Sequence, residues 1–288
     1  MLKTRIIGVL ILRAGIIVQS IGFERYLPVG SPYVALDYLN RWGIDEIVLL
    51  DIDATKEERL PNKGLLNRCC ELCHVPITVG GGIRSVSDVE YVIRSGGDKV
   101  VINSAAFENP NLVSEAVEVF GNQCVMVSLD VRRHENAYRV FTHSGRRETG
   151  VELTEMAKRV EGAGAGEILV NSIDRDGSSV GYDIDLLEAI LSVVTIPVIL
   201  CGGVGSASHF VPAAQRGVSA LAAANFFHWF EHSVIAAKQY LKRHGVDVRV
   251  DTYADYEDCP LNDAGRVSKI DDTVLEKLRF EYMPMEVI

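Results

Sequence analysis

The chain has 288 residues, 48% of them hydrophobic, and a formal net charge of −10 at pH 7. This length and composition predict one large α/β domain with a substantial core. The acidic balance argues against a general nucleic-acid-binding surface, which would need clustered Lys and Arg side chains. The apolar run at 6–12 is too short to span a membrane and lacks a signal-peptide cleavage site, so we expect a cytoplasmic protein without a membrane partner.

Short runs rich in Val and Ile alternate with amphipathic segments to about residue 244. We expect strands at 5–12, 46–51, 76–79, 98–102, 124–131, 166–171, 197–200 and 219–223. We expect helices at 32–42, 62–74, 86–95, 109–119, 152–163, 184–193, 207–216 and 232–244. A strand-like segment at 137–143 predicts a hairpin in the loop after the fifth strand. The alternation is typical of βα units around a parallel sheet.

Two similar stretches lie half a chain apart. Residues 75–85 and 196–206 are each a short apolar run that ends in glycines, and Pro76 and Pro197 give an offset of 121 residues. A repeat of this length indicates two related half-domains. With eight βα units, it favours a closed (β/α)8 TIM barrel of two half-barrels over an open doubly wound sheet. We expect this barrel to span residues 1–250.

Residues 251–288 form an acidic C-terminal extension with 10 acidic against 4 basic residues. Two interpretations stay open. The extension docks on the barrel surface or on a partner enzyme, or it is a flexible tail.

Glycine-rich turns follow several of the expected strands. The loops after the strands of a barrel meet at one face, where ligands bind. Glycine lets a backbone N–H approach a phosphate group closely, and nearby helix N-termini favour the anion. Two equivalent clusters follow the third and fourth strands and the seventh and eighth strands: Gly80, Gly81, Gly82, Asn103 and Ser104, and Gly202, Gly203, Ala224 and Asn225. They predict two phosphate groups, and tight turns without a ligand are the alternative.

Acidic side chains also stand where strands end. Asp130 closes the fifth strand and is the candidate general acid or base. Four more carboxylates follow the second and sixth strands: Asp51, Asp53, Asp174 and Asp176. For the last two, capping and turn formation are equal alternatives. The repeat places Ile11 opposite Asp130, and an isoleucine cannot transfer a proton.

The cysteines give little support for a metal centre. Cys69, Cys70 and Cys73 form one C-x-x-C pair, but no second pair stands at zinc-finger spacing. Small buried hydrophobic side chains are the simpler interpretation. We therefore predict no metal site and no cofactor.

Several motifs are more specific as a set than any one of them alone. They include Leu50-Asp-Ile-Asp53, Val79-Gly-Gly-Gly-Ile83, Asp98-Lys-Val-Val-Ile-Asn-Ser-Ala-Ala106, Ser172-Ile-Asp-Arg-Asp-Gly177 and Tyr240-Leu-Lys-Arg-His-Gly-Val-Asp-Val-Arg249. The set closely resembles the cyclase subunit of imidazole glycerol phosphate synthase over about residues 1–250. The resemblance implies a lyase-type barrel subunit that forms a heterodimer with a glutaminase. In that family, the barrel subunit joins ammonia from the glutaminase to a bis-phosphorylated ribulosyl nucleotide in histidine biosynthesis.

The resemblance also implies roles for individual residues. One phosphate site corresponds to Gly82, Asn103 and Ser104, and the other to Asp176, Gly177, Gly203 and Ala224, with Asn225 where a serine is usual. The second catalytic aspartate of the family corresponds to Asp130. The first falls at Ile11, and a lysine of the first mobile loop falls at Gln19. Because losing a general acid or base typically lowers a rate ~10²–10⁴-fold, we expect poor cyclase turnover.

Four charged residues stand at strand starts, on the face away from the glycine turns: Arg5, Glu46, Lys99 and Glu167. By resemblance they form a charged ring at the barrel floor, through which ammonia enters, and Asp98 contacts the glutaminase. An apolar interior behind the ring would admit neutral NH3 more readily than ammonium, which would lose its hydration. Four unrelated charges at strand starts are the alternative.

Intact ammonia delivery beside an altered cyclisation loop indicates a divergent paralogue. Such members resemble the cyclase subunit and are associated with ammonia supply to a separate sugar amidotransferase that amidates a surface-polysaccharide sugar. We favour this role. The standard cyclase of histidine biosynthesis and a non-catalytic ammonia conduit or scaffold remain alternatives, and function must be argued from the site.

Overall fold

The structure is a computed structural model and describes residues 3–135, 137–228, 232–250, 260–263 and 265–268. The Val- and Ile-rich runs and two hairpins form strands β1 Arg5–Arg13, β2 Ile16–Ile21, β3 Arg25–Gly30, β4 Glu46–Asp51, β5 Ile77–Gly80, β6 Lys99–Ile102, β7 Val125–His134, β8 Ala137–Thr142, β9 Arg147–Glu152, β10 Glu167–Ser172, β11 Val198–Cys201 and β12 Ala220–Ala223. The amphipathic segments form helices α1 Pro32–Arg41, α2 Lys63–Leu72, α3 Val86–Arg94, α4 Ser104–Glu108, α5 Leu112–Phe120, α6 Leu153–Gly162, α7 Ile184–Leu191, α8 Phe210–Ala214 and α9 Ser233–Arg243. Short 3-10 turns lie at η1 Asn122–Cys124, η2 Ile173–Arg175, η3 Ala207–His209 and η4 Asn225–His228.

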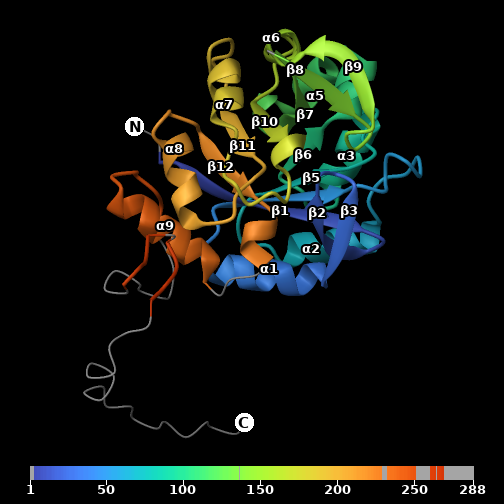
Figure 1. Cartoon of the computed structure of the whole chain (residues 1–288). Helices are drawn as coiled ribbons and strands as arrows, with labels where there is room; N and C mark the ends of the chain where they lie inside the picture. The colour runs from blue at the N-terminus through green and yellow to red at the C-terminus, as the bar shows by residue number, and fades with distance from the viewer. Residues whose placement is uncertain (1–2, 136, 229–231, 251–259, 264, 269–288) are drawn as a thin grey trace, which may run out of the picture.

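Eight of these strands pair in parallel around a closed ring. Their order is β10–β11–β12–β1–β4–β5–β6–β7, and β7 pairs with β10 to complete the circle. The helices lie around the outside of the strands (Figure 1). The expected (β/α)8 barrel is therefore confirmed.

The barrel strands lie within three residues of their expected bounds, whereas two helical segments differ. The helix expected at 109–119 begins at Leu112, because Asn109 precedes a proline and takes an extended conformation. A separate helix, α4, stands before it. The segment expected at 207–216 divides into the turn η3 and the short helix α8.

Side chains alternate between the two faces of the barrel wall, as the pleat of a strand requires. In β1, Ile7, Val9 and Ile11 belong to the apolar cluster inside the barrel. Leu10 and Leu12 belong to the larger core between the strands and the helices. Residues at alternate strand positions therefore face the barrel axis.

Two antiparallel hairpins extend from equivalent strands of the half-barrels. The expected hairpin is confirmed, because β8 pairs with β7, and β9 continues it. A second hairpin, β2–β3, extends from β1 and was not expected. The turns of the two hairpins meet, since a Cβ on Gly145 would lie 3.1 Å from the Phe23 ring. Together they cover the mouth of the barrel at the strand ends.

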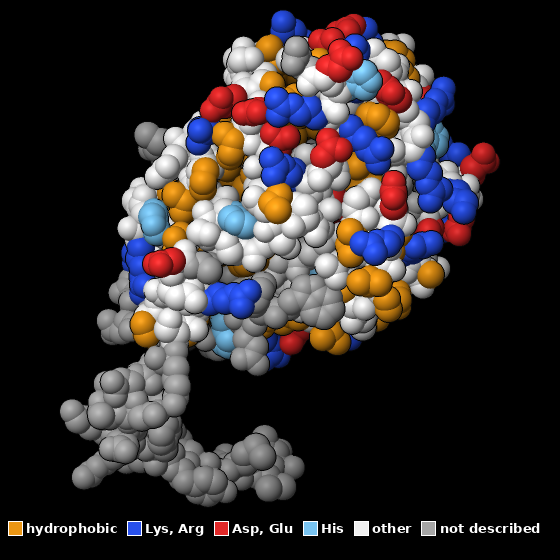
Figure 2. Space-filling view, in the orientation of Figure 1, with side chains coloured by type: hydrophobic (Ala, Val, Ile, Leu, Met, Phe, Trp, Pro, Cys, Tyr) orange, Lys and Arg blue, Asp and Glu red, His pale blue; other side chains and the backbone are white. Residues whose placement is uncertain are grey.

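On the outer surface, Lys and Arg side chains are interspersed with Asp and Glu side chains over the face shown in Figure 2. Among the described residues, no helix combines the length and the apolar character that crossing a bilayer requires.

A small part of the acidic extension contacts the barrel. Leu261 and Val267 pair in an antiparallel bridge, and Tyr240 of α9 donates a hydrogen bond to the Asp263 carbonyl at 3.0 Å. Gly265 is buried, and a Cβ there would collide with Ala207. Residues 251–259, 264 and 269–288 lie outside the described part, so docking of the whole extension stays a prediction.

The last helix is joined to the barrel floor by a buried ion pair. Lys238 of α9 is 1% exposed, and its Nζ lies 2.6 Å from Asp45 Oδ1 and 2.6 Å from the Gly43 carbonyl oxygen. The other Asp45 oxygen accepts the Ile6 N–H at 2.8 Å. This pair therefore links α9 to the start of β1 and to the turn before β4.

Replacing Lys238 with Met would leave the Asp45 carboxylate buried without its ammonium partner. Because breaking a buried pair in this way typically costs about 3–5 kcal/mol, we expect the free energy of unfolding in urea to fall by that amount. Lys158→Met, at an exposed position of α6, should change it by less than about 0.5 kcal/mol. Equal stability of the Lys238→Met chain and the wild type would contradict this role.

Candidate functional site

A cavity of about 140 Å³ opens at the carboxyl ends of the barrel strands. Its walls come from the inward positions of these strands, and its roof comes from the two hairpin turns through Phe23 and Ser144. Apolar side chains line its deeper part, among them Val9, Val101 and Leu169. The cavity thus lies where the loops of the barrel converge.

Asp130 is a buried carboxylate that lines this cavity. It follows Met126 and Ser128 at inward positions of β7 and is 8% exposed. Asn103 Nδ2 donates a hydrogen bond to its Oδ2 at 3.0 Å. Burial, together with the nearby Asp176 charge, raises the pKa of Asp130 to about 7, although the Asn103 hydrogen bond opposes this. A carboxyl with this pKa can both donate and accept a proton near neutral pH.

Ile11 lines the same cavity from β1. It is 8% exposed and belongs to the apolar cluster inside the barrel. Of the two repeat-related positions, one therefore presents a carboxylate to the cavity and the other an aliphatic side chain.

Asp176 reaches the cavity from the loop after β10 but is already engaged. Its Oδ2 accepts the Ser20 hydroxyl at 2.6 Å and the Phe23 N–H at 3.1 Å. Burial raises its pKa, and these hydrogen bonds oppose that shift. Asp176 therefore holds the β2–β3 hairpin over the cavity.

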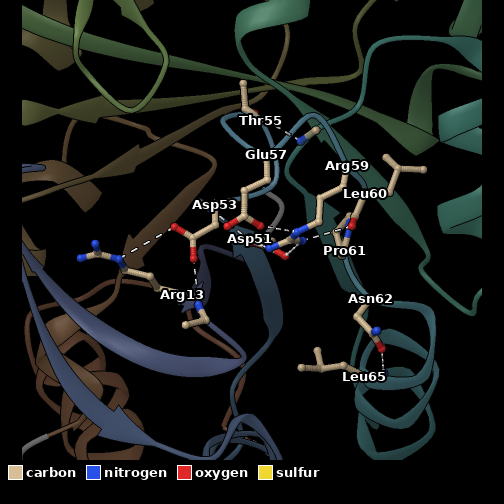
Figure 3. Close-up of polar contacts among 12 residues, drawn as sticks. Arg13, Asp51, Asp53, Thr55, Glu57, Arg59, Leu60, Pro61, Asn62 and Leu65 are labelled. Carbon is tan, nitrogen blue, oxygen red and sulfur yellow. Dashed lines mark hydrogen bonds and ion pairs between the residues drawn. The ribbon is translucent and has the colours of Figure 1, made fainter.

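Asp53 and Asp174 hold the chain where it leaves two equivalent strands. Asp53 accepts the N–H of Ala14 after β1 at 2.8 Å, and Asp174 accepts the N–H of Arg133 in β7 at 2.8 Å. Figure 3 shows Asp53 between this backbone contact and Arg13. Neither carboxylate lines the cavity, and both have the geometry of capping groups.

Asp51 lies at the edge of the cavity in an ion pair. It is 5% exposed and lies 2.6 Å from Arg59 Nη1, which leans over it from the loop before α2 (Figure 3). The hydrogen bond to Asp51 raises the pKa of Arg59. The Arg59 charge therefore balances the Asp51 carboxylate, and the ion pair holds the loop before α2 in place.

The first glycine cluster opens on the cavity. Four of its five residues, Gly81, Gly82, Asn103 and Ser104, line the wall, whereas Gly80 does not. The Gly82 N–H points to Thr55 Oγ1 at 3.3 Å, and a Cβ on Gly82 would collide with the Arg59 carbonyl. Ser104 Oγ accepts the His143 N–H of the β8–β9 turn at 3.0 Å. Glycine is thus required by close backbone packing, whether or not a phosphate binds.

The second cluster lies mostly outside the cavity. Of its predicted residues, Asp176 and Ala224 line the wall, whereas four do not: Gly177, Gly202, Gly203 and Asn225. A Cβ on Gly177 would lie 2.7 Å from the Ser20 carbonyl oxygen, and Asn225 Nδ2 donates to that oxygen at 2.7 Å. The β2–β3 hairpin therefore contacts Gly177 and Asn225, whereas Gly202 packs on Ser172 and Gly203 on Gly181.

Four charged side chains meet at the other end of the barrel. Arg5 lies 2.7 Å from Glu46 and 2.5 Å from Glu167. Lys99 lies 3.0 Å from Glu46 and 2.9 Å from Glu167, which closes an alternating ring. Burial alone would raise the pKa of Glu167, but the Arg5 and Lys99 charges lower it. Thr78, which sequence reasoning missed, donates to Glu46 at 3.1 Å.

Asp98 is exposed beside this ring. Its Oδ2 accepts the Ile77 N–H at 2.8 Å, which ties it to the start of β5. Its predicted contact with a partner protein stays a prediction.

Sequence reasoning missed several polar groups of the cavity. Asn171 lies beside Asp130 in the pairing of β10 with β7, and its Oδ1 is buried without a hydrogen-bond partner. Cys201, at the end of β11, also lines the wall, and burial raises its pKa to about 12. Counting inward positions to each strand end would have found both. Among the described residues, no group of three or more His, Cys, Asp or Glu side chains could hold a metal ion.

Comparison with known proteins shows the family to which the chain belongs. Residues 5–233 match the model of the family described as "Histidine biosynthesis protein". The chain is 41% identical over 267 residues to a Vibrio vulnificus protein named "Putative imidazole glycerol phosphate synthase subunit hisF2", with 92% of this chain and 98% of the relative covered. It is 41% identical to imidazole glycerol phosphate synthase subunit HisF of Caulobacter vibrioides, with 87% and 98% covered. It is 44% identical to the subunit of the same name from Hyphomonas neptunium, with 86% and 99% covered.

These matches span nearly the whole length of each relative. A match over 92% of 288 residues is longer than the barrel region 1–250, so the Vibrio relative shares part of the extension. The family match includes both half-barrels, the charged ring and the cavity. The chain therefore belongs to the histidine biosynthesis protein family, as a relative of the cyclase subunits of imidazole glycerol phosphate synthase.

Proposed function

We propose that this chain is a cyclase-type barrel subunit of an imidazole glycerol phosphate synthase, working with a glutaminase subunit as a heterodimer. It receives ammonia at the charged floor and binds a bis-phosphorylated ligand at the mouth. The observation that carries the proposal is that both ends of the barrel interior are polar. A closed ring of ion pairs lies at the strand starts, and a cavity lined by the buried Asp130 carboxylate lies at the strand ends.

The interior between these ends supports passage of neutral ammonia. Above the ring, most inward side chains are apolar, including Ile7, Val48 and Leu169. Ammonium would lose its hydration there, at a large cost in free energy, whereas NH3 would not carry an unpaired charge. Ammonia that crosses the ring would arrive beside Asp130.

Asp130 is the proton-transfer group in this proposal. Its buried carboxyl, with a pKa of about 7, can protonate or deprotonate a ligand nitrogen or oxygen at the cavity floor. Asn103 holds the carboxyl in place by its hydrogen bond. The ordinary pairing of two aspartates is absent, because Ile11 stands at the related position.

The expected role in amidation of a surface-polysaccharide sugar receives no support from the named relatives, which favour the synthase. One observation keeps ammonia supply to another acceptor as a second candidate. The floor ring is complete, while the cavity has only one of the two catalytic carboxylates. A chain specialised as an ammonia conduit would have this combination.

The cyclase assay separates the two candidates. With ammonium salts and the bis-phosphorylated ribulosyl nucleotide, we expect the wild type to form imidazole glycerol phosphate slowly. Asp130→Asn keeps the shape and the Asn103 contact but cannot transfer a proton, so the rate should fall by a further ~10²-fold or more. The exposed change Asp185→Asn should alter it by less than about twofold. Equal rates for wild type and Asp130→Asn would contradict the role of Asp130, and no product at all would favour the conduit.

Restoring the missing carboxylate tests why turnover is slow. Ile11→Asp should raise the ammonium-dependent rate about tenfold or more if a second acid or base is all that is lacking. Ile11→Asn has nearly the same shape without an ionisable group and is the matched control. Circular dichroism of both variants checks that the barrel is still folded. A rate for Ile11→Asp no higher than that for Ile11→Asn would show that other changes limit the reaction.

Ammonia delivery is tested at the floor ring. Lys99→Met removes the ammonium group that joins Glu46 to Glu167. We therefore expect part of the ammonia to escape to solvent at the barrel floor. With the glutaminase partner, product formed per glutamine hydrolysed should fall, while the rate with added ammonium salts should hold. Lys158→Met is the control for loss of one positive charge. An equal fall of both rates would place the effect in the cavity and contradict passage through the floor.

A further inference from the structure

Part of the acidic extension forms a small hairpin of its own. Within 260–268, the described residues Leu261 and Val267 pair in an antiparallel bridge, and the Ser268 N–H donates to the Pro260 carbonyl at 2.7 Å. We call this segment the C-terminal hairpin. Its backbone is held by its own hydrogen bonds, so it can press on the barrel as a unit.

The C-terminal hairpin packs on the turn η3 and on the helix α9. Gly265 lies against Ala207 of η3, and a Cβ on this glycine would be 2.3 Å from the Ala207 Cβ. The same Cβ would be 3.0 Å from the ring of Tyr240, whose hydroxyl donates to the Asp263 carbonyl at 3.0 Å. The Tyr240 ring also stacks on His244. A side chain at position 265 therefore has no room while the hairpin is docked.

The turn η3 in turn contacts the loop that carries Gly203. The Gly205 N–H donates to His209 Nδ1 at 3.2 Å, and the His209 N–H donates to the Ser206 carbonyl at 3.2 Å. A Cβ on Gly181 would be 3.5 Å from the His209 ring, and the Gly181 N–H donates to the Gly203 carbonyl at 2.7 Å. Contacts thus run continuously from the C-terminal hairpin through η3 to the second glycine cluster.

The repeat shows what η3 lacks. In the first half-barrel, Ser85 and Asp88 form a capping box that starts the helix α3. The residues 121 positions later are Ser206 and His209, and Ser206 makes no side-chain cap hydrogen bond. The segment also divides into η3 and the short helix α8, where the first half-barrel has one helix. The helix start of the second half-barrel is thus without its local cap, at the place where the C-terminal hairpin docks.

We propose that the C-terminal hairpin is a brace for this helix start and that it positions Gly203 for a phosphate group. With η3 held, the loop after β11 keeps one conformation before the ligand arrives. Without the hairpin, phosphate binding would also have to order that loop, which lowers the affinity. The proposal rests on the assignment of the second glycine cluster in the proposed function.

Gly265→Ala in the full chain tests the brace, because the added methyl group would collide with Ala207 and displace the hairpin. Gly150→Ala is the matched control. Gly150 has nearly the same left-handed backbone, with φ of +74° against +73°, and an added Cβ there would meet no atom within 4 Å. Both variants therefore have the same backbone cost, and only one has the collision.

Hydrogen exchange reports on the turn directly. The amides of His209 and Gly181 should exchange on the order of tenfold faster in Gly265→Ala than in Gly150→Ala, since their acceptors belong to the braced loop. The Ala106 amide, which donates to the Asn103 carbonyl at the first cluster, should exchange equally in both. Circular dichroism of both variants checks that the barrel is folded.

Phosphate binding is followed by a nuclear magnetic resonance titration with inorganic phosphate. The Gly203 amide reports the second cluster, and the Gly82 amide reports the first. Gly265→Ala should weaken binding at Gly203 by about threefold to tenfold and leave the affinity at Gly82 unchanged. Tyr240→Phe removes only the hydrogen bond to Asp263, so it should cause a smaller change in the same direction.

The outcomes separate the brace from the cluster. Equal exchange of the His209 amide in Gly265→Ala and Gly150→Ala would overturn the brace. Faster exchange with an unchanged phosphate affinity at Gly203 would overturn the positioning role. No response of Gly203 to phosphate in the wild type would instead overturn the assignment of the second cluster in the proposed function, while the exchange rates would still decide whether the hairpin holds η3.

Discussion

Closure of the barrel by the pairing of β7 with β10 is the constraint on which both ends of the molecule depend. All eight strands of the ring run in parallel, and their side chains alternate between the barrel axis and the helices. Inward positions at the strand starts therefore meet as one ring, which brings Arg5 between Glu46 and Glu167. Inward positions at the strand ends meet in the same way, which brings Asn103 against Asp130. A slip of one residue in a strand would turn its charged start and its polar end toward the helices.

The half-barrel repeat is preserved in the scaffold and broken in the cavity. Asp53 and Asp174 hold backbone N–H groups after β1 and in β7, and the two contacts have the same length of 2.8 Å. Such caps are needed wherever a strand ends in a tight loop, whatever the loop binds. Asp130 and Ile11, by contrast, occupy related positions with opposite chemistry. The two half-barrels thus differ in side chains that face the cavity. A side chain at a cavity wall can change in type more easily than one that packs between a strand and a helix.

Local patterns predicted the barrel strands well. Each strand is a short apolar run between turn residues, and these runs alternate with amphipathic segments along most of the chain. The charged ring was also accessible, since strand starts can be counted from the same runs. The β2–β3 hairpin was missed because several of its positions, such as Ile16 and Leu27, are exposed and its apolar pattern is short. Its decisive contact joins Ser20 to Asp176 across 156 residues of sequence, and no local pattern reports such a pair. For that reason the residues of the second glycine cluster could be named, while the contacts of Asp176, Gly177 and Asn225 with a hairpin could not be predicted.

The aliphatic side chain of Ile11 also bears on the pKa of Asp130, which lines the same cavity. A carboxylate at Ile11 would bring water, which lowers the pKa of Asp130, and a like charge, which raises it. The aliphatic side chain contributes only to burial, the main cause that raises this pKa to about 7. The charge of Asp176 also raises this pKa, and the Asp176 carboxylate accepts hydrogen bonds from Ser20 and Phe23 of the hairpin. The hydrogen bonds of the β2–β3 hairpin therefore bear on the pKa of Asp130 through Asp176, although the hairpin residues Ser20 and Phe23 bond to Asp176 and not to Asp130 itself.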